Sequence, residues 1–433
     1  MSAPPSTVNP MARVIGLRDF RLLFAGNTTS LLGDQLALIA TPWLVLQLTR
    51  DPRALGFVLA LEGIQRALFM LLGGAITDRL SPRRIMLIAD LVRFVLTALM
   101  TLAVFTGIVD TWMLYAFGLG FGLVAGFAVP AENSIVPMIV AGDDLQAGNA
   151  IMMGVGQLVG FIGPTLAGIV IAGYARSLDG IAIAFGLDAI SFAVSALCLW
   201  SIATGGTRTA DDGKESLLNS IVDGMRFLWN DRVLRLMIIS LTAVNFLLMG
   251  PLLVGIPVLA SQRLAEGAVA YGLLMSAFAG GNLAGFLLAG SLPRPTGSFM
   301  RWFITGFLVA FGVVVGVLGF IGSTWIDFGM LMALGLGNGY VAITLFTWMQ
   351  HRTPKDMIGR IMSIMMFSNT GLVPISQSLA GAAGKWDLNM MFACAGILMV
   401  GATVLIACQP AMSEFAASLV VEKMGMGPID TDA

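Results

Sequence analysis

A short charged turn between two long apolar segments decides the fold of this chain, and it reads Gly73-Gly74-Ala75-Ile76-Thr77-Asp78-Arg79-Leu80-Ser81-Pro82-Arg83-Arg84. The flanking segments, residues 54–76 and 85–108, are apolar apart from one acid and one arginine each. Each segment has the ~20 residues that a membrane-spanning helix needs. Because the turn contains three arginines, the positive-inside rule predicts that it lies on the cytoplasmic side, and the remaining topology follows by alternation.

The composition is that of a polytopic membrane protein rather than a globular enzyme. Of the 433 residues, 57% are hydrophobic and 11% are charged, whereas soluble domains contain about 25% charged residues. The net charge of -1 gives no reason to expect nucleic-acid binding. The three cysteines lie in apolar segments without metal-ligand spacing, and we find no nucleophile or phosphate-binding motif, so we expect neither enzyme activity nor a cofactor.

The hydrophobic pattern predicts an all-α membrane protein of about twelve spanning helices joined mostly by short connections. With both termini inside, alternation places most of the 24 lysines and arginines in cytoplasmic segments, as the positive-inside rule requires. The spans are expected at residues 20–48, 54–76, 85–108, 112–131, 146–174, 180–203, 233–260, 270–292, 300–322, 325–349, 358–384 and 388–409.

The two halves of the chain resemble each other, which predicts two pseudo-symmetric six-helix bundles. Gly148-Asn149-Ala150-Ile151 leads to Pro164, and Gly359-Arg360-Ile361-Met362 leads to Pro374. Internal duplication of this kind is typical of transporters that work by alternating access. The expected parts are a cytoplasmic N-terminal tail at 1–19, bundles at 20–203 and 233–410, a cytoplasmic linker at 204–232 and a cytoplasmic C-terminal tail at 411–433.

The linker at 204–232 is the longest connection, and its second half is amphipathic. Apolar residues recur there at helical spacing, namely Leu217, Leu218, Ile221, Met225, Leu228 and Trp229. We interpret this part as a helix that lies at the membrane surface. The alternative is a linker that only tethers the two bundles.

Acids inside the predicted spans are candidates for proton coupling, because a charge at the centre of a membrane helix costs ~2.5–3.5 kcal/mol and needs a partner or a function. Asp34 is the first candidate, since no basic residue is near it in its own helix. Glu62 is the second, and Arg66 lies one turn later on the same face; the alternative there is a static ion pair. Asp188 either carries a proton or anchors helix packing. The second half offers only Asp327, near the end of a span, so the proton carrier is expected in the first half.

Other polar residues within the spans receive different interpretations. Asp90 and Arg93 lie three residues apart near the cytoplasmic end of the third span, and we interpret them as structural. Neutral side chains are the candidates for lining a substrate cavity: Asn27, Gln35, Gln157, Asn245 and Asn369.

The opening turn carries a resemblance to a known family. Its pattern Gly-x-x-x-Asp-Arg-x-x-x-Arg-Arg, between the second and third spans, resembles the signature loop of the major facilitator superfamily. The matching residues are Gly74, Asp78, Arg79, Arg83 and Arg84. The resemblance covers nearly the whole chain and implies a transporter of two six-helix bundles that rock about a site near the membrane midplane.

Asp78 is expected to act as a conformational switch. It ends the second helix, and across the bundle interface the helix that begins near Gly359 should present free backbone N–H groups and a positive dipole end, which stabilise a carboxylate by ~0.3–1 kcal/mol. Closing this contact would favour the state that is shut on the inside. The three arginines would hold the loop and bind lipid phosphates, or serve only as topology anchors.

Small residues in the fifth span resemble the antiporter signature of drug exporters in this superfamily. The matching residues are Gly156, Gly160, Gly163, Pro164 and Gly168, with Ala167 in place of one family glycine. Small residues at this spacing also let helices pack closely in many membrane proteins, which is the alternative.

Further stretches resemble the macrolide-efflux and siderophore-export branch, and they are Asp19-Phe20-Arg21-Leu22-Leu23, Gly33-Asp34, Asp188-Ala189-Ile190-Ser191-Phe192 and Gly224-Met225-Arg226-Phe227-Leu228. This resemblance implies export of bulky, partly apolar compounds in exchange for protons. The fourth span departs from the pattern, because it lacks the relay arginine of many superfamily antiporters and carries Glu132 where relatives often have a base. Coupling through Asp34 or Glu62 is therefore the working hypothesis.

The sequence as a whole predicts a proton-driven exporter of amphipathic small molecules such as drugs, macrolides or siderophore-like compounds. We expect a monomer in the lipid bilayer of a bacterial cell membrane, with both termini cytoplasmic and the proton gradient as its energy source. A proton-coupled importer or a carrier for a specific metabolite or lipid is the alternative within transport. A non-transporting membrane sensor is the alternative outside it.

Overall fold

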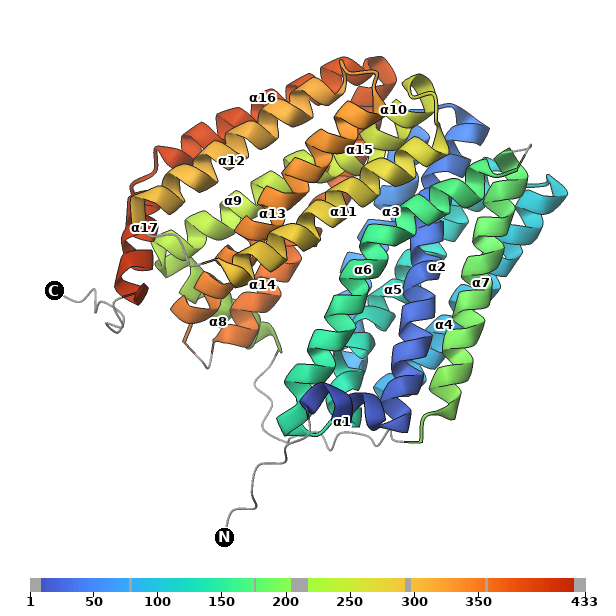
Figure 1. Cartoon of the computed structure of the whole chain (residues 1–433), viewed down its shortest axis with the longest axis horizontal. Coiled ribbons are helices and arrows are strands. Elements are labelled where there is room, and N and C mark those ends of the chain that lie inside the picture. Colours follow the sequence, from blue (N-terminus) through green and yellow to red (C-terminus); the bar gives the residue numbers. More distant parts are fainter. Residues whose placement is uncertain are drawn as a thin grey trace, which may run out of the picture. The chain divides into compact units, whose positions relative to one another are not determined.

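The computed structural model describes residues 9–77, 80–174, 177–203, 217–292, 297–354 and 357–423, and every regular element within them is a helix (Figure 1). This confirms the predicted all-α class. The elements are α1 (Pro10–Gly16), α2 (Arg18–Thr49), α3 (Pro52–Thr77), α4 (Pro82–Thr106), α5 (Thr111–Ile139), η1 (Gly142–Asp144), α6 (Leu145–Ala172), α7 (Ser177–Ser201), α8 (Leu217–Asn230), α9 (Arg232–Gly250), η2 (Pro251–Gly255), α10 (Ile256–Arg263), α11 (Ala268–Ser291), α12 (Gly297–Leu318), α13 (Thr324–Arg352), α14 (Ile358–Thr370), α15 (Val373–Trp386), α16 (Leu388–Ala407) and α17 (Pro410–Lys423).

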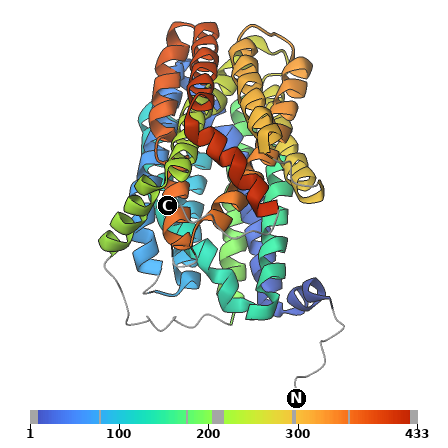
Figure 2. The ribbon, with the colours of Figure 1, turned by 90° about the vertical axis from the view of Figure 1, so that its left-hand side faces the viewer.

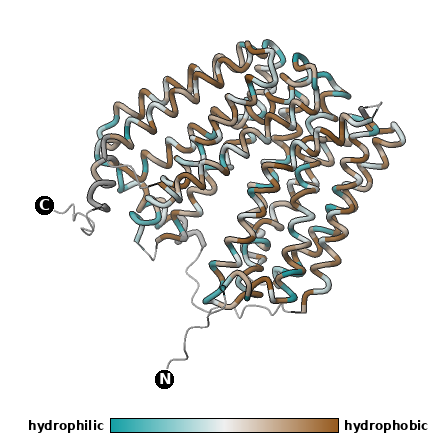
Figure 3. Tube along the Cα trace, viewed as in Figure 1, coloured by the Kyte–Doolittle hydropathy of each residue, from teal (hydrophilic) through white to brown (hydrophobic). Residues whose placement is uncertain are grey.

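Helices long and apolar enough to cross a membrane number ten within the described ranges, with α9, η2 and α10 counted as one continuous span. Three further helices, α3, α14 and α15, occupy the positions of the second and eleventh predicted spans. The second span is α3, which contains Glu62 and Arg66. The eleventh is interrupted between α14 and α15, where Pro374 near the start of α15 has no backbone N–H to continue the ladder. Figure 3 shows apolar residues running along the long helices.

Several spans begin at an aspartate whose side chain accepts hydrogen bonds from the first free N–H groups. Asp110 accepts from the Thr111 N–H at 2.6 Å and Asp387 from the Met390 N–H at 3.0 Å. Asp231 accepts from the N–H groups of Val233 and Leu234 at 2.9 and 3.0 Å. Caps of this type satisfy donors that have no partner inside the helix, so they fix where the helix starts.

The chain forms two compact units. Unit 1 consists of Met1–Thr49, Ile64–Ala210 and Tyr271–Ser276, and unit 2 of Arg50–Gly63, Asp211–Ala270 and Ala277–Ala433. Two helices are divided between the units. Residues 50–63, which include the start of α3, pack with unit 2, whereas the rest of α3 packs with unit 1. Residues 271–276 of α11 pack with unit 1, whereas the rest of α11 packs with unit 2. The predicted bundles at 20–203 and 233–410 and the tails and linker around them stay predictions.

Unit 1 is built around α7, which packs against both α2 and α4, while α6 packs against α2 and α5 against α4. Gly33 of α2 permits the close approach of α7, because a side-chain carbon there would overlap the Ser191 hydroxyl and lie 2.5 Å from an Asp188 carboxyl oxygen. One end of the unit is closed by a cluster of buried apolar residues that includes Val14, Phe20, Ile85, Ile135 and Leu199.

Unit 2 pairs α12 with α16 and α9 with α15. Its apolar cluster joins residues of α8, α9, α12, α13, α14 and α17, and Trp348 meets Phe415 edge to face at 4.9 Å between ring centroids. Figure 2 shows α17, in red, running obliquely to the long helices of this unit. The helix α17 is thus packed against unit 2 through Met412 and Phe415.

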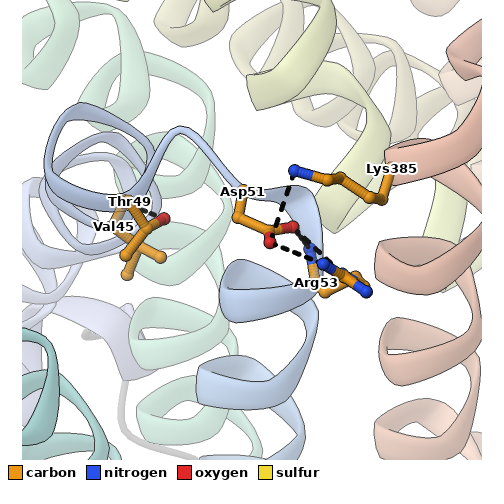
Figure 4. Close-up of polar contacts among 5 residues, drawn as sticks. All are labelled: Val45, Thr49, Asp51, Arg53 and Lys385. Carbon is orange, nitrogen blue, oxygen red and sulfur yellow. Dashed lines mark hydrogen bonds and ion pairs between the residues drawn. The ribbon is translucent and has the colours of Figure 1, made fainter.

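Segment 50–63 belongs to unit 2 because it packs against α15. The Lys385 ammonium lies 3.5 Å from Asp51 Oδ2, and the Arg53 guanidinium lies 3.2 Å from the same oxygen (Figure 4). Burial alone would raise the pKa of Asp51, but hydrogen bonds from the Arg53 side chain and backbone N–H outweigh it and hold this pKa below its usual value. Further along, a side chain at Gly56 would collide with the α15 backbone at Gly381.

Two glycines on each of α11 and α13 bring these helices into backbone contact, and they are Gly281, Gly285, Gly335 and Gly339. A side-chain carbon at Gly335 would overlap the Phe278 carbonyl oxygen and lie 3.0 Å from the Asn282 backbone nitrogen. The same approach lets the Asn338 amide donate to Asn282 Oδ1 at 2.9 Å. Small residues at helix interfaces allow this packing in membranes, where there is little hydrophobic force between helices.

We predict that Gly335→Ala destabilises the protein, because the added methyl must push α11 away from α13; overpacking typically costs about 1–3 kcal/mol. Gly329→Ala on the same helix is the control, since a side-chain carbon there meets no described atom within 4 Å. Thermal unfolding in detergent measures both, and equal apparent Tm values for the two variants would contradict the proposed contact.

Candidate functional site

A buried arginine lies at the centre of the ionisable groups of unit 1. Arg93 of α4 is only 6% exposed, and its guanidinium lies over the adjacent rings of Phe121 and Phe192, 5.7 and 5.5 Å from their centroids. The two rings come from α5 and α7. Removing a guanidinium from water is costly, so a cation held in this way requires acids nearby.

The acids come from four different helices. The Glu132 carboxylate of α5 lies 3.6 Å from Arg93 Nη1. The guanidinium also interacts electrostatically with Asp34 of α2, Asp90 of α4 and Asp188 of α7. We call these five residues the Arg93 cluster. Since it combines one cation with four carboxyl groups, the cluster can accommodate protons or a further positive charge.

Asp188 is the most buried member of the Arg93 cluster. Its side chain is fully buried, and within the described residues neither carboxyl oxygen has a hydrogen-bond partner. The carboxyl faces Gly33 across the contact between α2 and α7, and it interacts electrostatically with the neighbouring Asp34, which is half-buried. Two carboxylates so placed repel each other in a medium of low dielectric constant, and binding one proton relieves the repulsion.

The role of Arg93 was missed in the sequence, where Asp90 and Arg93 were interpreted as a structural pair. Asp90 has a polar neighbour on α7, the Ser195 hydroxyl, and within the described residues one of its carboxyl oxygens has no hydrogen-bond partner. Arg93 interacts with Asp90 of its own helix and also with acids of three other helices, α2, α5 and α7. The superfamily pattern directs attention to a base in the fourth span, whereas here the base comes from the third span and the fourth supplies Glu132. The available signal was an arginine inside a span that contains only one other charged residue, Asp90.

The residues of the opening turn have separate surroundings. Asp78 and Arg79 lie outside the described residues. Arg83 donates from Nε to the Leu199 carbonyl oxygen at 2.7 Å and from Nη2 to the Trp200 carbonyl oxygen at 2.6 Å, so it caps the end of α7. Arg84 is exposed. A side chain at Gly74 would meet no described atom within 4 Å, and Gly359 lies in the first turn of α14.

The predicted pair of Glu62 and Arg66 lies on α3, where both side chains are half-buried. Their ion pair stays a prediction. The structure brings Asp34 and Asp188 together in the Arg93 cluster, and the coupling role of Glu62 and Arg66 stays a prediction.

The glycines of the antiporter-like run in α6 differ in their surroundings. Side chains at Gly156 and Gly160 would meet no described atom within 4 Å, whereas one at Gly163 would overlap the Gln35 side chain of α2. Pro164 and Gly168 are buried. Only part of this run therefore serves helix packing within unit 1.

Beside Pro164, α6 packs against segment 271–276 of α11. A side chain at Gly272 would collide with the Pro164 carbonyl group. Thr165 donates to Ser276 Oγ twice, from its hydroxyl at 2.8 Å and from its backbone N–H at 3.0 Å. The Tyr271 hydroxyl donates to the Leu38 carbonyl oxygen of α2 at 3.3 Å. Pro164 of α6 thus lies at a contact with α11, and the same segment of α11 also contacts α2.

The candidate cavity residues divide between the two units. In unit 2 the Asn245 amide of α9 donates to Asn369 Oδ1 of α14 at 2.8 Å, so these two residues meet. In unit 1, Gln35 contacts the Gly163 position, and Asn27 and Gln157 are half-buried. Their role in substrate binding stays a prediction.

Asp327, which the sequence analysis noted only as an acid near the end of a span, is buried in unit 2. Asp327 in the first turn of α13 is fully buried, and within the described part of the chain neither of its carboxyl oxygens has a hydrogen-bond partner. The second half therefore does hold an acid as buried as Asp188, although the expected location of the proton carrier in the first half stays a prediction.

Long apolar helices that enclose buried ionisable groups and close glycine contacts define a polytopic membrane transporter. The chain belongs to the Major Facilitator Superfamily, whose model matches residues 23–376. It is therefore a transporter and not an enzyme, and small molecules are its class of substrate.

Two curated relatives and one solved structure are similar over most of this length. The chain is 26% identical over 401 residues to the multidrug efflux pump Tap of Mycobacterium tuberculosis, covering 88% of this chain and 92% of that one. It is 26% identical over 407 residues to the enterobactin exporter EntS of Escherichia coli, covering 89% and 91%. A crystal structure of a bacterial homologue of the iron transporter ferroportin matches with a TM-score of 0.68 at 17% identity, over 90% of this chain and 99% of that one, and shows the fold alone.

We predict that Arg93→Gln lowers stability by about 3–5 kcal/mol, because it leaves buried acids without their cation. The double variant Arg93→Gln with Asp188→Asn should regain part of this loss, since one buried charge is then removed. Arg84→Gln is the control on the same helix, as Arg84 is exposed. Thermal unfolding is measured for the unsubstituted protein, the two single variants Arg93→Gln and Asp188→Asn, and the double variant, which together form a double-mutant cycle. Additive effects of the two substitutions would show that Arg93 and Asp188 are not coupled.

A second prediction concerns Asp327. Asp327→Asn should raise the apparent Tm at neutral pH, because an amide of the same shape replaces a carboxyl that no described group satisfies. Asp179→Asn, in the first turn of α7, is the control and should leave the Tm unchanged or lower it slightly, since a carboxylate favours a helix start. A clear drop in the Tm of Asp327→Asn would mean that the carboxyl group itself stabilises α13.

Proposed function

We propose that this protein is a proton-coupled exporter of amphipathic small molecules, in which Asp34 and Asp188 bind the coupling proton. The observation that carries the proposal is the fully buried Asp188 carboxyl, which lies beside Asp34 and lacks a hydrogen-bond partner within the described residues. A buried acid of this kind is costly to keep unless its protonation is used. The names of the relatives Tap and EntS, an efflux pump and an exporter, support the direction of transport.

In the proposed cycle, Arg93 is the positive charge whose interactions change when an aspartate binds a proton. When Asp34 and Asp188 are both ionised, the guanidinium is their counter-charge, together with its ion pair to Glu132. When one of the two aspartates binds a proton, the attraction between Arg93 and that group falls. Binding or release of a proton therefore changes the electrostatic attraction among α2, α4, α5 and α7, because each of these helices contributes a member of the Arg93 cluster.

The remaining parts of the proposal follow the sequence analysis. Export by alternating access would take place in a bacterial plasma membrane, with both termini cytoplasmic and a single chain as the working form. Asp78 would act as the switch at the end of α3, and Arg83, which caps α7, would hold the turn in place. The proton gradient would provide the energy.

We expect Asp34→Asn to reduce transport driven by a pH gradient at least tenfold, because an amide cannot release a proton at this position. The measurement uses the full-length protein in proteoliposomes, with a macrolide and a fluorescent amphipathic dye as probes. Asp143→Asn is the matched control, since Asp143 is exposed on η1 and outside the Arg93 cluster.

Probe binding by Asp34→Asn, measured without a gradient, should persist. Undiminished gradient-driven transport would remove Asp34 from the mechanism. Proton movement in the same direction as the probe would replace antiport by symport, and hence export by import.

A further inference from the structure

We propose that the exposed side of α8 binds anionic phospholipid headgroups, and that the bilayer surface thereby holds α8 against the first turn of α14. Four exposed residues of α8 form a stripe along one side of the helix, because their spacing is i, i+3, i+4 and i+7. They are Val222, Met225, Arg226 and Trp229, and the Trp229 ring is 60% exposed. The stripe combines apolar groups, one indole and one guanidinium.

The opposite side of α8 is fixed to unit 2. Leu228 is buried in the apolar cluster shared with α9, α13 and α17. At Gly224 the backbone of α8 comes so close to α14 that a side-chain carbon would lie 3.1 Å from Arg360 Cβ and 3.2 Å from Ile364 Cδ1. Figure 1 shows α8 beside α14. The exposed stripe therefore faces away from unit 2, and its burial requires something other than this unit.

The charges of this region leave the exposed side positive. Asp223 Oδ2 lies 3.6 Å from Arg360 Nη1, on the side of α14. Asp231 is paired with Arg352 at 2.7 Å; burial alone would raise its pKa, but the hydrogen bonds from Arg352 and from the Leu234 and Val233 N–H groups outweigh it, so this pKa lies below its usual value and the group is ionised at neutral pH. The acids of this helix and its junction with α9 are thus neutralised by arginines of other helices.

Three further arginines remain at this end of unit 2. Arg226 and Arg232 are exposed, and neither has a carboxylate partner within the described residues. Arg235 stacks on Trp229, with its guanidinium 5.5 Å from the ring centroid, and donates to the Trp229 carbonyl oxygen at 2.6 Å. Arginines beside an interfacial tryptophan attract the anionic headgroups of a membrane, while the indole occupies the headgroup level.

Chain connectivity favours a membrane over an acidic soluble protein as the occupant. α8 ends at Asn230 and the membrane-spanning α9 begins at Arg232, so one residue separates the helix from a membrane entry point. A helix attached so closely to a span, with Val222, Met225 and Trp229 exposed, presents apolar groups where headgroups and acyl chains meet. Through Asp223 and Gly224, the same helix contacts Arg360 in the first turn of α14, which links lipid binding to the position of that turn.

The first test measures binding of short-chain phosphatidylglycerol to the full-length protein in neutral detergent. The double variant R226Q/R232Q should bind it ~25-fold more weakly, since each arginine near a membrane surface contributes about fivefold in affinity. R18Q/R21Q, which removes two exposed arginines from the start of the spanning helix α2, is the matched control for charge; unlike R226Q/R232Q, it should leave the position of α8 in the bilayer unchanged in the second test. Free inorganic phosphate should compete weakly, because it offers no apolar group.

The second test locates α8 in the bilayer. Met225→Cys, in a chain whose three cysteines are replaced by alanine, receives a nitroxide label in nanodiscs that contain phosphatidylglycerol. Lipid-soluble oxygen should relax the label more than a water-soluble nickel complex does, and R226Q/R232Q should reverse this order. Unchanged phosphatidylglycerol binding by R226Q/R232Q, or a Met225 label open to water in these nanodiscs, would overturn the proposal and leave the stripe to a soluble partner.

Discussion

Burying a guanidinium in an apolar helix bundle is the constraint on which unit 1 depends. Arg93 is almost completely removed from solvent, and its charge is balanced by acids on α2, α4, α5 and α7. Electrostatic interactions are strong where the dielectric constant is low, so the four helices are held in one relative arrangement by this charge. A change in the charge of any acid of the Arg93 cluster therefore acts on all of them, which is the property that a proton-driven transporter needs.

Unit 2 is stabilised by different means. Two amide pairs, Asn245 with Asn369 and Asn282 with Asn338, join its described spans, whereas its ion pairs Asp51 with Lys385 and Asp231 with Arg352 lie at helix ends. Close helix packing comes from glycines of α11 and α13. Neutral pairs do not respond to protonation, so we place the coupling chemistry in unit 1. Asp327 is an ionisable group of unit 2 that is fully buried and has no described hydrogen-bond partner.

The glycines show why composition alone is a weak guide to contact. Gly160, Gly163 and Gly335 lie in similarly apolar sequence, yet a side chain at Gly160 would meet open space within the described residues, while Gly163 faces Gln35 and Gly335 faces the backbone of α11. Family resemblance selected the run in α6 as an antiporter motif, and the structure shows that its glycines do not share one role. The glycines of α11 and α13 lie outside the family motif, but their spacing, Gly281 with Gly285 and Gly335 with Gly339, is the Gly-x-x-x-Gly pattern that indicates close helix packing in membranes.

The sequence by itself determined the class of protein, the approximate positions of the spans and the superfamily, because hydropathy and the turn at residues 73–84 are local properties that need no partner. It also placed Asp34 and Asp188 among the residues of interest. Only the tertiary structure decided that Arg93 joins them, that Arg83 caps α7 and that Asp327 is buried. The reason is that a membrane helix is apolar on all sides, so its sequence pattern does not fix its rotation about its own axis. That rotation, set by packing against neighbours distant in the chain, determines which charged groups meet.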